Sequence, residues 1–203
     1  NVGSARHPAL RPAANDDYVA TVTGSRLFLL NRRTGETVWD RDLGHNPTLG
    51  ATMSATHVFV PSIRGRIEAY QLPNDESDHA ITRPWVYHSG SRIASLPLVT
   101  ARTISWSTVN GQVFVADLKG PSVLYRHQTG APVWGQATFL PPNYLLMASN
   151  DGYVSAVDEM DGEIKWSFST GDEIDTSPLV SRDRVYAVTR TGQLYCIVSE
   201  LGE

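Results

Sequence analysis

Apolar residues along the chain gather in runs of five or six residues, which is the usual length of a β-strand. Each of five such runs leads into a tight-turn dipeptide and then into a second apolar run. The dipeptides are Gly24-Ser25, Arg64-Gly65, Asn110-Gly111, Asp151-Gly152 and Thr191-Gly192. Asn-Gly and Asp-Gly are strong hairpin signals because both central residues accept positive φ. The pattern therefore predicts five hairpins with two-residue turns, and no stretch has the period of a long amphipathic helix.

Two further strands complete each unit. The predicted hairpin strands are 18–23 with 26–31, 57–62 with 66–72, 103–108 with 112–118, 144–149 with 153–158, and 184–189 with 193–198. A polar turn follows the second strand and leads into a short strand that carries a large aromatic residue: Trp39, Trp85, Tyr125 and Trp166. A strand also precedes each of the last four hairpins, at 49–54, 94–100, 135–140 and 176–181.

The spacing of these features shows an internal repeat. The second turn residues, 25, 65, 111, 152 and 192, are separated by 40, 46, 41 and 40 residues. The distances from turn to aromatic residue are 14, 20, 14 and 14, so one six-residue insertion within 72–83 explains both irregularities. Four antiparallel strands in a repeat of about 41 residues are typical of a β-propeller blade. A β-sandwich is the structural alternative, but it does not require equal repeats.

We therefore predict an all-β fold, a β-propeller of four-stranded antiparallel blades, with residues 1–203 forming one propeller domain or a propeller fragment. The predicted blades span about 7–47, 48–93, 94–134, 135–173 and 174–203. The fifth lacks its outer strand, because residues 200–203 align with the polar turn at 33–36. Either five blades close with an incomplete last blade, or the chain is part of a larger ring of seven or eight blades.

Composition narrows the function classes. Seventeen basic and 21 acidic residues give a net charge of -4, which argues against binding to nucleic acid or an anionic membrane. A single cysteine, Cys196, excludes an intrachain disulfide framework and a CxxC zinc site. No apolar run approaches the ~20 residues of a membrane span. The chain begins with Asn1 and nothing near it is typical of a signal peptide, so we expect a processed or trimmed product.

One segment resembles a known repeat. Residues 156–166, Ala-Val-Asp-Glu-Met-Asp-Gly-Glu-Ile-Lys-Trp, are similar to the PQQ-type propeller repeat, in which alanine, any residue and aspartate precede a Thr-Gly turn, with tryptophan four residues after the glycine. The segments 177–180 and 185–188 match the first two strands of the same repeat. The other units fit in part, and the residues in their alanine position are Leu29, Ala69, Val115 and Cys196. The resemblance covers nearly the whole chain.

The resemblance implies several expectations. Members of the family include quinoprotein dehydrogenases, BamB-type propellers of bacterial outer-membrane assembly, and sensor or adhesion domains. The repeat aromatic of the family docks on a neighbouring blade, which implies that Trp39, Trp85, Tyr125 and Trp166 are largely buried at blade contacts. The family also implies a periplasmic or otherwise extracytoplasmic location in a bacterium.

Catalytic chemistry finds little support. Quinoprotein dehydrogenases resemble one another in a vicinal cysteine pair over the cofactor and in Ca²⁺ held by Glu, Asn and Asp, and neither feature matches here. Cys196 aligns with apolar, mostly small residues, so we expect a buried and inert thiol. The six histidines, at 7, 45, 57, 79, 88 and 127, lack the spacing of zinc ligands. We predict no catalytic residue, no cofactor and no metal.

Loops between blades are the candidate binding sites. Asn46, Arg92, Trp134 and Asp175 lie just before the innermost strands, where propeller loops surround one mouth of the central channel. The alternative interpretation is a solvated loop with an occasional packed aromatic residue. The acidic insertion at 73–79 is predicted to be exposed decoration on the outer rim.

Three function classes remain open. We predict a non-catalytic propeller that acts as a protein-binding scaffold, BamB-like, with a protein partner, no nucleic acid and no membrane span in this chain. The alternatives are a fragment of a PQQ-dependent quinoprotein dehydrogenase, or a ligand-sensing domain of a larger receptor. Sequence beyond the two ends discriminates them: a lipoprotein signal favours the first class, vicinal cysteines the second, and a membrane span or kinase domain the third.

Overall fold

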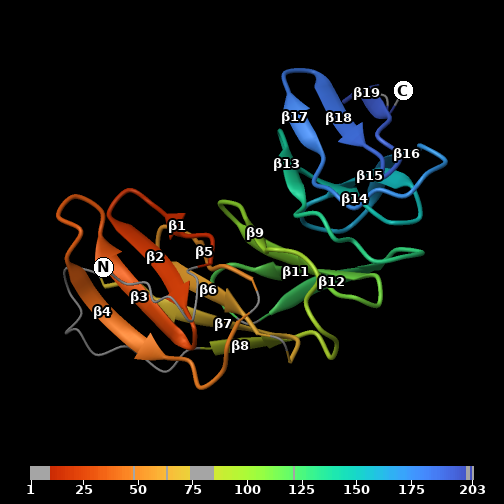
Figure 1. Ribbon diagram of the computed structural model, residues 1–203. Helices are drawn as coiled ribbons and strands as arrows, with labels where there is room; N and C mark the ends of the chain where they lie inside the picture. Colours follow the sequence, from red (N-terminus) through yellow and green to blue (C-terminus); the bar gives the residue numbers. More distant parts are fainter. Residues whose placement is uncertain are drawn as a thin grey trace. The chain divides into compact units, whose positions relative to one another are not determined.

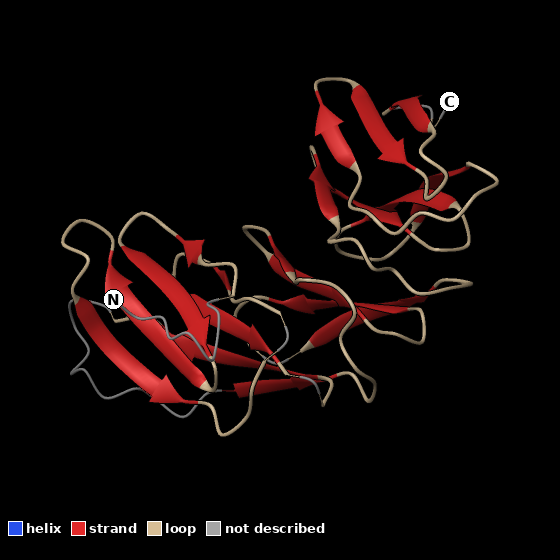
Figure 2. Ribbon diagram, in the orientation of Figure 1, coloured by secondary structure: helices blue, strands red, loops and turns tan. Residues whose placement is uncertain are grey.

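The computed structural model describes residues 10–47, 49–62, 64–73, 85–120, 122–199 and 202. The chain divides into two compact units, Asn1–Arg92 and Ile93–Glu203, and each unit is described by itself. The described residues form strands joined by turns and loops, with no helix among them (Figures 1 and 2). The boundary between the units falls next to the predicted boundary between the second and third blades.

The first unit holds two antiparallel sheets, each with its strands in chain order. The first sheet consists of β1 (Ala13–Ala14), β2 (Tyr18–Thr23), β3 (Arg26–Asn31) and β4 (Thr37–Asp42). The second consists of β5 (Thr52–Met53), β6 (His57–Pro61), β7 (Arg66–Gln71) and β8 (Trp85–His88).

The second unit holds three sheets of the same design. The third sheet consists of β9 (Leu98–Val99), β10 (Thr103–Ser107), β11 (Gln112–Asp117) and β12 (Val123–Gln128). The fourth consists of β13 (Thr138–Leu140), β14 (Tyr144–Ala148), β15 (Tyr153–Asp158) and β16 (Ile164–Ser169). The fifth has β17 (Leu179–Ser181), β18 (Arg184–Val188) and β19 (Leu194–Val198).

These sheets confirm the predicted all-β architecture of four-stranded antiparallel blades. The three-stranded fifth sheet ends at Val198, and residues 200, 201 and 203 of the predicted turn at 200–203 lie outside the described residues. The insertion at 73–79 is described only at Pro73. The innermost strands are shorter than predicted, with two or three residues each.

The hairpin turns differ from the prediction in four of the five blades. Only the first hairpin has a two-residue turn, with Thr23 paired to Arg26. In the fourth blade the Ser149 amide donates to Tyr153, which leaves three turn residues that end in Gly152 at φ 87°. A three-residue loop of this kind needs positive φ only at its last position, and glycine supplies it. The corresponding glycines of the other three blades, all at positive φ, are Gly65, Gly111 and Gly192.

The aspartate or asparagine of the repeat shapes the next turn. The Asp158 Oδ1 atom accepts the amides of Met160 at 2.8 Å and Asp161 at 3.3 Å. In the first blade, Asn31 Oδ1 accepts two amides of its own turn in the same way. Each is an Asx turn, in which the side-chain oxygen of Asp or Asn accepts backbone amides two and three residues later in the chain. The aspartate or asparagine of the repeat motif therefore has a structural role, because its side chain stabilises the turn that follows.

The alanine position of the repeat lies opposite the aromatic residue. Ala156 pairs with Trp166, and the three other such pairs are Leu29 with Trp39, Ala69 with Trp85, and Val115 with Tyr125. In the first, third and fourth blades the ladder shifts register immediately after this pair, which is a β-bulge. The bulge recurs at one repeat position, so it belongs to the blade design.

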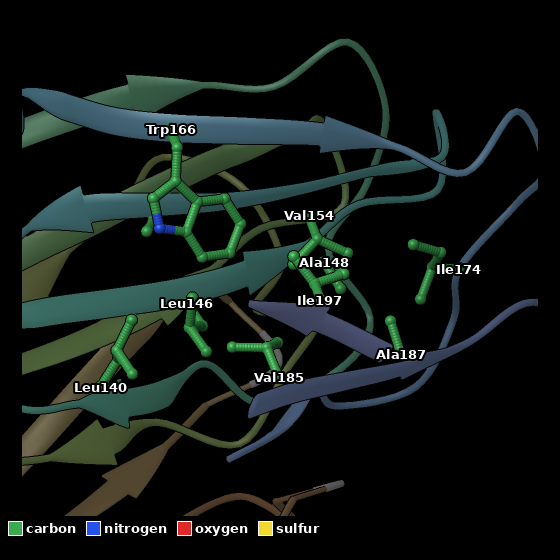
Figure 3. Close-up of a cluster of buried hydrophobic side chains, with 10 residues drawn as sticks. Leu140, Leu146, Ala148, Val154, Trp166, Ile174, Val185, Ala187 and Ile197 are labelled. Atoms are coloured by element: carbon green, nitrogen blue, oxygen red, sulfur yellow. The ribbon is translucent and has the colours of Figure 1, made fainter. Parts of the chain in front are cut away.

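Trp166 joins the fourth and fifth blades. Its side chain is 8% exposed and its indole N–H donates to the Ser199 carbonyl oxygen at 2.8 Å. It lies in a buried apolar cluster from both sheets (Figure 3) that comprises Leu140, Leu146, Ala148, Val154, Ala156, Trp166, Ile174, Val185, Ala187 and Ile197. Tyr125 makes the equivalent link from the third blade to the fourth, because its hydroxyl donates to the Asp158 carbonyl oxygen at 2.8 Å. Tyr125, Trp39 and Trp85 are partly buried.

Candidate functional site

The four predicted contact residues lie in segments that join the outer strand of one sheet to the inner strand of the next. Asn46 lies between β4 and β5, Arg92 between β8 and β9, Trp134 between β12 and β13, and Asp175 between β16 and β17. All four are exposed, and Trp134 exposes 40% of its surface. A large aromatic side chain with that exposure is available to a partner.

Buried neighbours anchor these segments, and Asn46 is followed by the buried Pro47. Arg92 is followed by Ile93, Trp134 is preceded by Val133, and Asp175 is preceded by Ile174. These apolar neighbours are 5%, 2% and 0% exposed, respectively. A loop with one buried residue beside an exposed one has a defined course, which lowers the ordering cost of binding.

A repeated hydroxyl group fixes where each loop leaves its sheet. The Thr170 hydroxyl lies 2.9 Å from the Gly152 carbonyl oxygen and 2.8 Å from that of Asp172. The Thr129 hydroxyl lies between the Gly111 and Ala131 carbonyl oxygens, and the Ser89 hydroxyl between those of Gly65 and Ser91. Sequence reasoning missed this feature. The sequence does carry a signal for it, because a threonine follows the turn glycine by 18 residues in two blades, at Thr129 and Thr170.

Two of the predicted contact residues lie on adjoining loops. A Cβ atom at Gly135 would lie 2.4 Å from the carbonyl oxygen of Thr176, so glycine permits a close approach of the two backbones. Trp134 and Asp175 are the direct sequence neighbours of these two residues. Among the described residues, no hydrogen bond or ion pair joins the side chains of Trp134 and Asp175.

The loop that carries Asp175 is acidic and internally ordered. The Asp172 carboxylate accepts the hydroxyl and the amide of Thr191, and Glu173 forms an ion pair with Arg190 at 2.7 Å. The Thr191 hydroxyl is the main reason why the pKa of Asp172 lies below its ordinary value. The Glu173 carboxylate beside Arg190 raises the pKa of that guanidinium. The loop therefore presents an Asp172 carboxylate that Thr191 keeps in its charged form near neutral pH.

The two predicted contact residues of the first unit are not linked to each other. The imidazole of His45, next to Asn46, lies 2.9 Å from the Leu43 carbonyl oxygen through Nδ1. Arg92 follows the segment that the Ser89 hydroxyl fixes. In the part of the first unit that the structure describes, no hydrogen bond or ion pair connects Asn46 with Arg92.

The prediction of a buried thiol at Cys196 is wrong, because this residue is exposed. Cys196 pairs with Tyr186 across β18 and β19, whereas the equivalent Ala156 is fully buried beneath the fifth sheet. The difference arises because no described residue covers the corresponding face of β17–β19. A hydrogen bond with Cys196 is the main cause that raises the pKa of the Tyr186 hydroxyl.

The residues that the structure describes offer no cluster of acidic side chains for the Ca²⁺ ion of a quinoprotein centre. They include no group of three or more His, Cys, Asp or Glu side chains that could hold a metal ion. In the acidic loop, the Asp172 carboxylate is engaged with Thr191 and the Glu173 carboxylate with Arg190.

Comparisons with known proteins identify the family. The family model described as "Outer membrane protein assembly factor BamB" matches residues 2–144 and 135–203. A search of the curated proteins finds no match. No helix in the described part of the chain is long and apolar enough to cross a membrane.

A solved structure shows the same fold. The crystal structure of BamB from Moraxella catarrhalis superposes with a TM-score of 0.78 at 20% sequence identity. The match covers 95% of this chain and 62% of that one. Because the family model matches nearly the whole sequence, the chain belongs to the BamB family of PQQ-repeat β-propellers.

Proposed function

We propose that this chain is a non-catalytic propeller that acts as a protein-binding scaffold outside the cytoplasm, in the periplasm of a bacterium. The observation that carries the proposal is the match of both sequence segments to a family named for an assembly factor of outer membrane proteins. An assembly factor works through contacts with other proteins. Its binding surface must therefore be exposed and held in a fixed shape.

The loops between the sheets supply such a surface in each unit. In residues 93–203, exposed Trp134 and Asp175 lie on adjoining loops that Val133 and Ile174 anchor in the core. Tryptophan beside fixed polar groups is a frequent centre of binding energy at protein interfaces. In the first unit, Asn46 and Arg92 offer polar and charged contacts at the equivalent positions.

The charges suggest the chemistry of the partner. Asp172, Glu173 and Asp175 form an acidic loop, and only one arginine, Arg190, is paired within it among the described residues. A complementary partner would present Lys or Arg side chains to this loop and an apolar residue to Trp134. Such complementarity mainly increases the association rate and the specificity.

The test is capture followed by measured binding. The chain is immobilised, partners are captured from a bacterial envelope extract with cross-linking, and affinity for the purified partner is measured by interferometry. Trp134→Ala should weaken binding by about 30-fold, the effect of a hot-spot residue. Arg92→Glu should weaken it as well, because it reverses the charge of an exposed predicted contact residue.

Two control variants show whether the effect is local. Leu124→Ala removes another exposed apolar side chain, and Arg33→Glu reverses a charge in the β3–β4 turn. Both should bind as the wild type does. Equal losses in controls and loop variants would contradict the assigned surface. Stoichiometric PQQ binding with dye-linked alcohol or sugar oxidation in the presence of Ca²⁺ would overturn the scaffold function itself.

A further inference from the structure

A pocket lies between the third and fourth blades, at the end of the sheets away from the Trp134 loop. It has a volume of about 470 Å³ and is lined by the β9–β10 turn, the β13–β14 turn and Glu159. β13 begins after the loop that carries Trp134 and ends at the turn that carries Pro142. The pocket and the Trp134 loop are therefore separated by the length of the sheet, and one ligand does not fill both.

A buried carboxylate forms the base of this pocket. Glu159 is 2% exposed, and its carboxylate accepts hydrogen bonds from the hydroxyls of Thr100 and Thr103 and from Arg102 Nη2 at 2.7 Å. Burial alone would raise the pKa of Glu159, but these three donors and the Arg102 charge outweigh it and hold the pKa below its ordinary value. Glu159 is thus a fixed anion under the turn of the neighbouring blade.

The second blade shows that the fold does not need a carboxylate here. Leu72 occupies the equivalent position, and its amide donates to the Thr56 carbonyl oxygen as the Glu159 amide donates to Asn143, both at 2.8 Å. Leu72 is 4% exposed and packs in the apolar cluster of the first unit. Because an apolar residue usually stabilises such a position at least as well as an ion pair does, stability does not explain Glu159.

The ion pair instead holds Arg102 at the mouth of the pocket. The Arg102 side chain is 52% exposed, and Glu159 is its only ion-pair partner among the described residues. The guanidinium donors that do not face Glu159 can meet a ligand. The pair is neutral overall, so it favours an uncharged hydrogen-bond acceptor over an anion. The walls beside it are largely apolar and comprise Val99, Ala101, Phe139 and Pro142.

We propose that this pocket is a second docking site, for an extended segment of a partner protein that inserts one large apolar side chain beside Phe139 and presents a backbone carbonyl oxygen to Arg102. The proposal rests on the protein-binding function above but assigns a separate surface. The second unit would then offer one binding feature at each end of its sheets, and the chain could hold two segments at once.

The test uses small probes, so that no natural partner is needed. N-acetyl-phenylalanine amide supplies the side chain and the carbonyl groups, and N-acetyl-alanine amide is the matched probe without the ring. Each is titrated into the ¹⁵N-labelled chain 1–203 and followed by amide chemical shifts. We expect saturable shifts confined to residues 99–103 and 139–143, with binding about tenfold weaker for the alanine probe.

Three variants separate the pocket from the Trp134 loop. Ala101→Trp places a large side chain on an exposed lining position and should abolish saturable binding while keeping the amide spectrum elsewhere. The double variant Arg102→Met with Glu159→Leu removes both charges and restores the residue type of the second blade, and it should weaken binding about fivefold, as for one lost hydrogen bond. Trp134→Ala should bind the probe as the wild type does.

Several results would overturn the proposal. They are shifts scattered over the surface, equal affinity for the two probes, unchanged binding in Ala101→Trp or in the double variant, and tighter binding of acetate than of the phenylalanine probe. Because the titration contains no partner protein, failure here leaves the capture experiment on the Trp134 loop intact. Loss of capture through Trp134→Ala, in turn, leaves the probe titration intact.

Discussion

Replacing Trp166 with alanine tests the packing that joins the fourth and fifth blades. The indole is 8% exposed within a cluster from both sheets, and a Cβ atom at Gly202 would lie 2.8 Å from its ring. Removal of a buried large aromatic side chain typically costs 3–5 kcal/mol, and we expect a loss of about 4 kcal/mol in the free energy of unfolding. Part of this loss is the hydrogen bond to Ser199, which contributes about 1 kcal/mol.

The loss should be visible in two assays. For a chain of this size, about 4 kcal/mol corresponds to a fall in the melting temperature of roughly 8–16 °C, measured by circular dichroism. Hydrogen exchange should show that amides of β18 and β19 lose protection before those of β10 and β11, because the fifth blade contacts the fourth through this cluster. Trp166→Phe keeps a ring in place and should lose about half as much.

The control is Trp134→Ala, which removes the same side chain from an exposed loop. Its effect on the free energy of unfolding should stay within about 0.5–1 kcal/mol, as for most surface substitutions. If Trp166→Ala destabilises the chain no more than Trp134→Ala does, the repeat aromatic does not join the blades. The docking role assigned to the whole aromatic series would then be wrong.

Three further predictions concern single contacts. The pKa of Glu159 is lowered in the folded chain, so the ionised carboxylate stabilises the fold. This contribution to the free energy of unfolding is complete above about pH 4.3 and is lost as the pH falls. Glu159→Gln should therefore flatten the acidic part of a stability–pH curve measured by urea unfolding. Gly162→Ala should lower the free energy of unfolding by about 2–4 kcal/mol, because the new Cβ would lie 2.6 Å from the Tyr125 ring. Gly35 also has a positive φ but has open space around it, so Gly35→Ala should cost only about 1 kcal/mol in thermal melts. Tyr125→Phe removes the hydrogen bond to the Asp158 carbonyl oxygen and should cost about 1 kcal/mol in the same melts. Equal losses for the two glycine variants, or an unchanged pH profile in Glu159→Gln, would contradict the contacts described.

Local signals were sufficient to predict the blades. The hairpins follow from glycine-containing turns between apolar runs, and a strand period needs no knowledge of distant residues. The turn length was mispredicted because the dipeptide Asp151-Gly152 fits both a two-residue turn and the end of a three-residue loop. Only the pairing of Ser149 with Tyr153 decides between them.

Interactions between blades were harder to predict. Glu159 looks like an ordinary polar turn residue in the sequence, and its hydroxyl partners Thr100 and Thr103 lie 59 and 56 residues earlier in the chain. Its burial follows from how two sheets meet, which no local pattern encodes. The error at Cys196 has the same origin, because the alanine position is buried only where another sheet covers it.

The repeat also indicates where function can differ between blades. Residues that recur, such as the turn glycines, the Asx residue and the aromatic side chain, each have a packing or turn role in the structure. Residues that do not recur are free of that constraint, and they lie at the two ends of the sheets: Trp134 and Asp175 on the inter-blade loops, and the Glu159–Arg102 pair in the opposite turns. A rigid repeated scaffold keeps both sets in place, since the turn glycines and aromatic side chains that hold the blades occupy other positions of the repeat.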